Sequence, residues 1–157
     1  MPSTLPARVA RVLARGEGEP LNVIGDRQTV KVSAEASDGA FVLVENLNPP
    51  GVGIPMHVHH EEDEVFYVIS GQVEFTLADG PVVAEAGATV FLPKETPHAF
   101  RVVGDSPARM LTLLVPGRLE GLFRELATFP PGPPDPERLM ATCAPYGIEF
   151  LPPTDTA

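Results

Sequence analysis

The sequence predicts an all-β domain of the sandwich or barrel type, followed by a short helical tail. The 157 residues suffice for one domain with one hydrophobic core. Turn signals such as Asp38-Gly39 and Asp79-Gly80 recur between short apolar stretches from residue 21 to residue 115, a spacing typical of antiparallel β architectures. The nineteen proline and fourteen glycine residues also favour many turns over long helices.

The predicted strands are bounded by these turns, and several of them alternate between apolar and polar residues. The alternation is clearest in Gln72–Leu77, where Val73 and Phe75 share one face. Such a strand belongs to a sheet with one face on the core and the other in solvent. The ten expected strands are Leu21–Ile24, Gln28–Ser33, Ala40–Asn46, Met56–His59, Glu64–Ser70, Gln72–Leu77, Val82–Ala84, Ala88–Leu92, His98–Val103 and Arg109–Val115.

Helical periodicity replaces the strand pattern in the last quarter of the chain. Arg118–Ala127 places four apolar side chains on one stripe. Asp135 followed by Pro136 predicts the start of a second helix that ends near Ala144. We therefore expect three segments, namely an N-terminal extension (1–20), a β-barrel (21–116) and a helical, proline-rich tail (117–157) that packs on the outside of the barrel.

The composition excludes several classes of partner. Eleven basic and twenty-one acidic side chains give a net charge of −10, and a negative field repels the phosphates of nucleic acid. The sequence has neither the run of about 18 apolar residues that a membrane span needs nor the apolar core of a secretory signal, so we expect no membrane partner and a cytoplasmic location. The only cysteine, Cys143, is expected to pack in a helix as a small hydrophobe.

All four histidines lie in two short stretches of the predicted barrel. His57 and His59 point to the same face of their strand. A hairpin turn would bring Glu64, at the start of the next strand, back over these two imidazoles. The first stretch also contains His60, and the second stretch contains His98. Three imidazoles and one carboxylate suit a divalent first-row metal ion.

These two stretches resemble the two signature motifs of the cupin superfamily. The first motif, G-x5-H-x-H-x4-E-x6-G, is matched at every fixed position, and the second, G-x5-P-x-G-x2-H-x3-N, is matched at three. Glu95 stands where the family has glycine, and Val102 stands where it has asparagine. The resemblance implies a small double-stranded β-helix of the jelly-roll kind. The matching residues are Gly51, His57, His59, Glu64 and Gly71 in the first motif and Gly87, Pro93 and His98 in the second.

The resemblance further implies that His57, His59, Glu64 and His98 bind one divalent transition metal, with iron, manganese, nickel, copper and zinc all open. The general layout is similar to bacterial quercetinase-like cupins, which implies a non-haem dioxygenase whose metal leaves two positions for substrate and O₂. The expected substrate is a small apolar, phenolic or enolic molecule. Glu64 is expected to act as ligand and as catalytic base. The alternatives are an O₂-independent isomerase or lyase and a non-catalytic small-molecule binder.

Strand parity predicts what surrounds the metal. Phe66 and Val68 share a face with Glu64, and Phe100 shares one with His98, so these three residues are expected to line the substrate site. Ordinary core packing is the alternative for each of them. His60 and the acidic residues 61–63 are expected to form a solvated turn. Open sheet edges and the apolar tail lead us to expect a homodimer.

Overall fold

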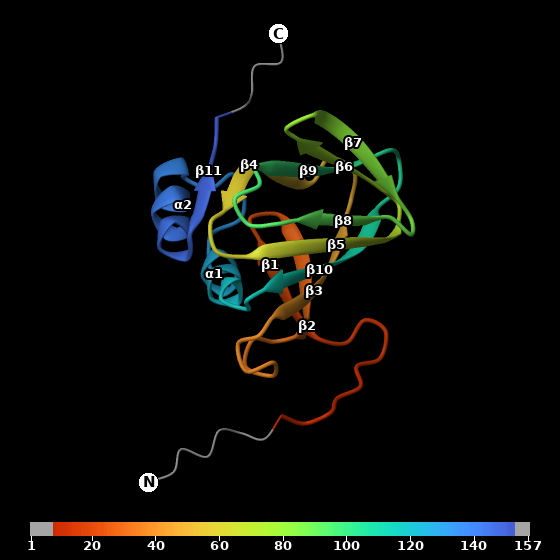
Figure 1. Cartoon of the computed structure of the whole chain (residues 1–157), viewed down its shortest axis with the longest axis vertical. Helices are drawn as coiled ribbons and strands as arrows, with labels where there is room; N and C mark the ends of the chain where they lie inside the picture. The colour runs from red at the N-terminus through yellow and green to blue at the C-terminus, as the bar shows by residue number, and fades with distance from the viewer. Residues whose placement is uncertain (1–7, 153–157) are drawn as a thin grey trace.

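The computed structural model describes residues 8–152 and shows two antiparallel sheets packed face to face (Figure 1). The six-stranded sheet has the order β1-β2-β3-β10-β5-β8, and the five-stranded sheet has the order β11-β4-β9-β6-β7. The expected all-β jelly-roll class is therefore confirmed. The strands are β1 (Glu19–Val23), β2 (Asp26–Val32), β3 (Val42–Asn48), β4 (Gly53–His59), β5 (Asp63–Ser70), β6 (Gln72–Leu77), β7 (Gly80–Glu85), β8 (Thr89–Leu92), β9 (His98–Val103), β10 (Ala108–Val115) and β11 (Ile148–Phe150).

The ten strands expected from the sequence are all present, and alternation along them builds the core. In β6, Val73 and Phe75 are fully buried while Glu74 between them is partly exposed. The rings of Phe66, Phe75 and Phe100 pack together between the sheets, with centroids 5.1–6.2 Å apart. This spacing lies in the range that aromatic pairs prefer. The aromatic cluster fixes the distance between the two sheets beside the candidate site.

The tail contains the two predicted helices, α1 (Leu119–Leu126) and α2 (Pro136–Cys143), followed by a short 3₁₀ turn. The Asp135 carboxylate accepts a hydrogen bond from the Arg138 backbone N–H, 3.0 Å away, so the predicted helix cap is confirmed. Strand β11 was not predicted, because three residues are too short to show a period-two pattern. It pairs with β4 and extends the five-stranded sheet.

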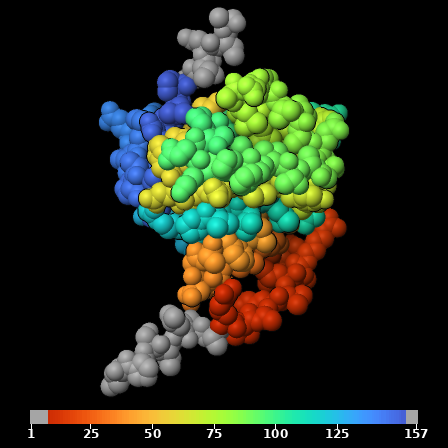
Figure 2. Space-filling view, viewed as in Figure 1, coloured from red at the N-terminus to blue at the C-terminus, as the bar shows by residue number. Residues whose placement is uncertain are grey.

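The tail packs against the barrel and adds side chains to the hydrophobic core. Leu119, Leu122 and Leu126 of α1 are buried together with Cys143 and Ile148 against strands of the six-stranded sheet. The apolar stripe of α1 requires this burial, because an exposed stripe of leucines would leave apolar surface in water. Figure 2 shows the tail (blue) lying against one side of the molecule.

The remaining segments are short. Residues 8–18 precede β1, are mostly exposed, and lie at the lower end of the molecule in Figure 2. The first seven residues of the expected N-terminal extension and the last five of the tail lie outside the described residues. Within residues 8–152, neither helix is long and apolar enough to cross a membrane.

We expect a homodimer in solution. Strands β8 and β7 form edges of the two sheets, and unpaired edges are sites of association. Phe91 on β8 and Val82 on β7 are 61% and 51% exposed, which adds apolar surface to both edges. Light scattering should therefore give about twice the chain mass of 16.7 kDa. A mass near that of one chain at micromolar concentration would contradict the expectation.

Candidate metal centre

The four predicted donors lie together in the interior, and they come from both sheets. His57 and His59 lie on β4 and His98 lies on β9, all in the five-stranded sheet. His57 and His98 are direct partners in the β4–β9 register. Glu64 lies on β5 in the six-stranded sheet. One ligand atom from each of the four residues lies within 4.8 Å of those of the others, and all four residues are buried.

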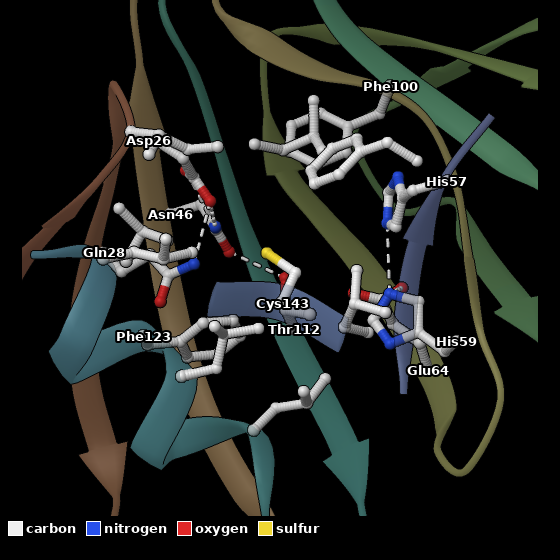
Figure 3. A pocket seen from close by; sticks show the side chains of 18 of the residues that line it. Asp26, Gln28, Asn46, His57, His59, Glu64, Phe100, Thr112, Phe123 and Cys143 are labelled. Atoms are coloured by element: carbon white, nitrogen blue, oxygen red, sulfur yellow. Dashed lines mark hydrogen bonds and ion pairs between the residues drawn. The ribbon is translucent and has the colours of Figure 1, made fainter. Parts of the chain in front are cut away.

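The connection between β4 and β5 is not the predicted hairpin. Strand β4 is paired on one side by β9 and on the other by β11, so β5 has no free edge to pair with. The chain instead crosses to the opposite sheet after His59. Glu64 therefore faces the imidazoles across the interior, as Figure 3 shows for His57 and His59. Glu64 lies next to the imidazoles as predicted. It does so because the chain crosses to the opposite sheet, and not because β4 and β5 form a hairpin.

Backbone carbonyls orient two of the three imidazoles. The ring N–H at Nδ1 of His57 donates to the Pro55 carbonyl at 2.8 Å, and that of His98 donates to the Thr96 carbonyl at 2.9 Å. A neutral imidazole that donates from Nδ1 carries its lone pair on Nε2. These lone pairs point into the cluster. This is the arrangement that metal-binding histidines have in proteins, where the outer nitrogen is held by a second group.

The distances within the cluster fit one metal ion. His57 Nε2 lies 3.1 Å from His59 Nε2, and the Glu64 carboxylate lies 3.3 Å from His59 Nε2 and 3.0 Å from His98 Nε2. Ligands about 2.1 Å from one ion lie about 3.0 Å apart when they are neighbours at right angles. Glu64 Oε2 and His98 Nε2 are also buried without a hydrogen-bond partner among the described residues. The four residues could hold a metal ion that would satisfy these atoms.

The electrostatics of the cluster also suit a cation. Burial, together with the neighbouring imidazoles, lowers the pKa of His57 to about 3, and burial lowers that of His59. Burial opposes ionisation of Glu64, but the three imidazoles outweigh it and hold the carboxyl pKa below its usual value. At neutral pH the cluster therefore offers lone pairs on His57 and His59 and a carboxylate on Glu64. His98 differs, because the Glu64 carboxylate outweighs burial and raises its pKa. Metal ligands must be deprotonated, so a bound metal would have to displace any proton from His98 Nε2.

The loop before β9 explains one departure from the family motif. Glu95, which replaces the usual glycine, has a φ of +67°, in the left-handed region that glycine adopts most easily. Its backbone N–H donates to the His59 carbonyl at 2.8 Å, and its carboxylate lies 2.9 Å from His60 Nδ1. These two contacts offset the conformational cost. The loop thus keeps the glycine-like conformation next to the ligand strand although the glycine is absent.

A cavity of about 70 Å³ is lined by three of the four donors, His57, His59 and Glu64. Phe66 and Phe100 line it, as predicted from strand parity. Val68 is fully buried in the aromatic core and does not line the cavity, because it lies two residues further along β5. Much of the remaining wall was not predicted, since it comes from the tail. The tail residues that line it are Leu119, Leu122, Phe123, Leu126, Cys143, Ile148 and Phe150.

The turn after His59 is only partly solvated. His60 is half-exposed and hydrogen-bonds with Glu95 and Glu149 at 2.9 Å, away from the donor cluster, as strand parity predicts. Glu62, however, is 0% exposed and has no hydrogen-bond partner among the described residues. Its carboxylate lies 3.9 Å from His59 Nδ1. The expectation of a solvated Glu62 was wrong, because Glu62 shares the inward face with Glu64 two residues later.

The buried Glu62 should make the stability of the metal-free protein depend on pH. Burial and the charge of Glu64 raise the pKa of Glu62 from 4.5 to about 7. A raised carboxyl pKa stabilises the fold below pH 4.5, and this contribution is lost as pH rises through 7. One pKa unit corresponds to 1.36 kcal/mol, so the loss by pH 8 is about 3 kcal/mol. Glu62→Gln should therefore match the wild type at pH 4 and exceed its free energy of unfolding at pH 8.

Urea unfolding of chelator-treated protein at the two pH values measures this difference. The matched control is Glu137→Gln, which removes an exposed carboxylate from α2. Titrations of the buried histidines affect variant and wild type alike, so the difference between the two proteins isolates Glu62. Equal pH profiles for Glu62→Gln and the wild type would contradict the assignment.

Comparisons with known proteins agree with this architecture. The family model described as "Cupin domain" matches residues 43–114. Quercetin 2,3-dioxygenase of Bacillus subtilis (strain 168) is 32% identical over 145 residues, which is 90% of this chain but 40% of the relative. The chain therefore spans less than half the length of that enzyme.

Solved structures show the same fold. A predicted oxalate decarboxylase from Thermotoga maritima has a TM-score of 0.60 and 23% identity, over 67% of this chain and 98% of that one. The polyketide cyclase RemF from Streptomyces resistomycificus also has a TM-score of 0.60, with 19% identity over 68% of this chain and 80% of that one. Together with both motifs and the His/Glu cluster, the domain match and the similarity to the dioxygenase support a cupin-superfamily protein, and the solved structures share its fold.

Proposed function

We propose that the chain is a metal-dependent oxygenase, of the dioxygenase kind, that acts on a small phenolic or enolic molecule. His57, His59, Glu64 and His98 would hold one divalent transition metal. The observation that carries the proposal is the convergence of these four donors, three of which (His57, His59 and Glu64) line one side of a mostly apolar cavity. The similarity to quercetin 2,3-dioxygenase supports the choice of reaction class.

Each group at the site has a role in this proposal. A bound metal would act as a Lewis acid on a substrate oxygen and provide a place for O₂. Phe66 and Phe100 would hold the apolar part of the substrate and exclude water from the cavity. Glu64 is ionised at neutral pH, because its neighbours lower its pKa. Its carboxylate would accept the hydroxyl proton of the arriving phenol or enol, which makes it the catalytic base as well as a ligand.

The size of the cavity favours a second candidate, an O₂-independent isomerase or lyase. A cavity that binds benzene has a volume of about 150 Å³, more than twice the 70 Å³ of this cavity. A phenol therefore requires the tail residues in the cavity wall to move, whereas a small enol needs less space. Simultaneous binding of substrate and O₂ needs more room still. Chemistry with a single small occupant fits the cavity with the least rearrangement.

Activity in air and under nitrogen separates the two reactions. The metal-loaded protein is incubated with a panel of small enols and phenols, with an oxygen electrode and mass spectrometry as readouts. The proposal predicts O₂ consumption matched to substrate loss in air, and no substrate loss under nitrogen. Equal substrate loss under nitrogen would establish the isomerase or lyase instead. Binding of panel compounds without turnover in either atmosphere would indicate a non-catalytic small-molecule binder.

A further inference from the structure

A second polar cluster lines the same cavity on the side away from the metal donors. Asp26 and Gln28 lie on β2, Asn46 and Asn48 on β3, and Thr112 on β10. All five side chains are buried, with exposures between 1% and 6%. All but Asn48 line the cavity. Figure 3 shows Asp26, Gln28 and Asn46 on one side of the cavity and His57, His59 and Glu64 on the other.

The Asp26 carboxylate organises this cluster. It accepts hydrogen bonds from the side-chain amides of Gln28 at 2.9 Å, Asn46 at 2.9 and 3.0 Å, and Asn48 at 2.6 Å. Burial raises the pKa of Asp26, and the three amides that donate to its carboxyl group oppose that rise. Each amide turns its NH₂ group toward Asp26 and its carbonyl oxygen elsewhere. The cluster thus has a fixed polarity: its donors point inward to the carboxylate.

The amide oxygens left over by this arrangement are acceptors. The oxygen of Asn48 accepts from the Arg27 backbone N–H at 2.8 Å, and that of Asn46 accepts from the Thr112 hydroxyl at 2.7 Å. The oxygen of Gln28, Oε1, is buried without a hydrogen-bond partner among the described residues. Thr112 has donated its only proton, so its oxygen too can only accept. The groups that this wall can offer to a ligand, Gln28 Oε1 and Thr112 Oγ1, are therefore both acceptors.

A buried acceptor without a partner has lost its hydrogen bonds to water and gained none in return, and natural proteins rarely contain one without a reason. We infer that Gln28 Oε1, together with Thr112 Oγ1 in the same cavity wall, forms a specificity subsite for a hydroxyl group at the far end of the substrate. This inference rests on the proposed function, because it places the other end of the substrate at the metal. The substrate would then have one metal-binding end, an apolar middle and one hydrogen-bond donor at the opposite end.

Slender metal-binding probes of graded length test the subsite. The probes are hydroxamic acids whose alkyl chains contain one to four methylene groups and end in a hydroxyl group. Each is compared with the analogue of equal length in which a methyl group replaces the hydroxyl. Calorimetry with the zinc-loaded full chain gives their dissociation constants. At the best chain length, the hydroxyl probe should bind about tenfold more tightly than its methyl partner, as expected for one buried hydrogen bond.

Two variants connect this preference to the named residues. Gln28→Met keeps the length of the side chain but removes the acceptor, and should reduce the tenfold ratio to about one. Thr112→Val, which keeps the shape and removes the hydroxyl, should reduce the ratio in part, and it serves as the second variant if Gln28→Met does not fold. Zinc content should remain one per chain in both, because neither residue is a metal donor.

The outcomes separate this inference from the function on which it rests. If methyl-ended probes bind the zinc-loaded protein but no hydroxyl-ended probe binds better at any length, the subsite is overturned and the metal centre stands. The subsite is also overturned if both variants keep the wild-type ratio of the two probes' dissociation constants and lose only stability in urea. The polar cluster would then have a purely structural role. If the chain takes up no zinc, the metal centre and the subsite are overturned together; if it carries one zinc per chain but no hydroxamate binds, the subsite alone is overturned.

Discussion

Purified protein should carry close to one divalent metal ion per chain, and His57→Ala or His98→Ala should each lose most of it. Both imidazoles are buried, and both have their Nδ1 groups held by backbone carbonyls. Removing a group that only orients a ligand typically lowers metal affinity about 10–100-fold. Loss of a ligand itself should therefore cost more than about 100-fold. Elemental analysis after extensive dialysis measures the metal content directly.

The chain provides a matched control for this experiment. His60 is the one remaining histidine, and it is half-exposed and bonded to Glu95 and Glu149 outside the donor cluster. His60→Ala should keep its metal. The two ligand variants should stay folded, because the core does not depend on the metal, unlike that of a zinc finger. A metal-free wild type that also refuses added iron, nickel and zinc would rule out the proposed centre.

Local signals predicted only part of the donor cluster. His57 and His59 share one strand face, and strand alternation carries this information over short distances. The resemblance to the family motifs added Glu64 and His98, which come from other strands. The pairing partner of β5 was mispredicted, because short sequence separation favours a hairpin and nothing local reveals that β11 already occupies the second edge of β4. The short strand β11 therefore occupies the edge of β4 that a β4–β5 hairpin would have used.

The wall of the cavity was harder to predict, for two different reasons. The tail residues depend on how α1 docks, which is long-range information. Asn46, in contrast, lies on the same strand face as the buried Val42 and Val44, and Gln28 shares its strand face with the buried Val30. Polar residues at apolar positions of an alternating strand are a readable signal of a buried polar cluster. Side chains two residues apart on a strand point to the same face. Counting back two residues from Glu64 would therefore have predicted that Glu62 is buried.

Glu64→Gln should reduce turnover far more than it reduces metal content. Glutamine keeps the size of the side chain and one weak oxygen ligand, and three imidazoles remain to bind the metal at lower affinity. The change removes the negative charge and with it the ability to accept a proton. Loss of a general base typically costs about 10²–10⁴-fold in rate. Once a substrate is known, the rate per bound metal should fall by a factor in this range.

Normalising the rate to bound metal separates the two roles of Glu64. If Glu64 only coordinates the metal, Glu64→Gln would lower the metal content and leave the rate per bound metal unchanged. Solvent would then remove the substrate proton, or the metal would release it by lowering the substrate pKa. The control is Glu74→Gln on β6, whose carboxylate pairs with the exposed Arg101 and belongs to neither cluster. It should keep both metal and rate. A carboxylate that lies 3.0 Å from His98 Nε2 and borders the cavity is placed to do both, because its two oxygens allow one to coordinate while the other accepts the proton.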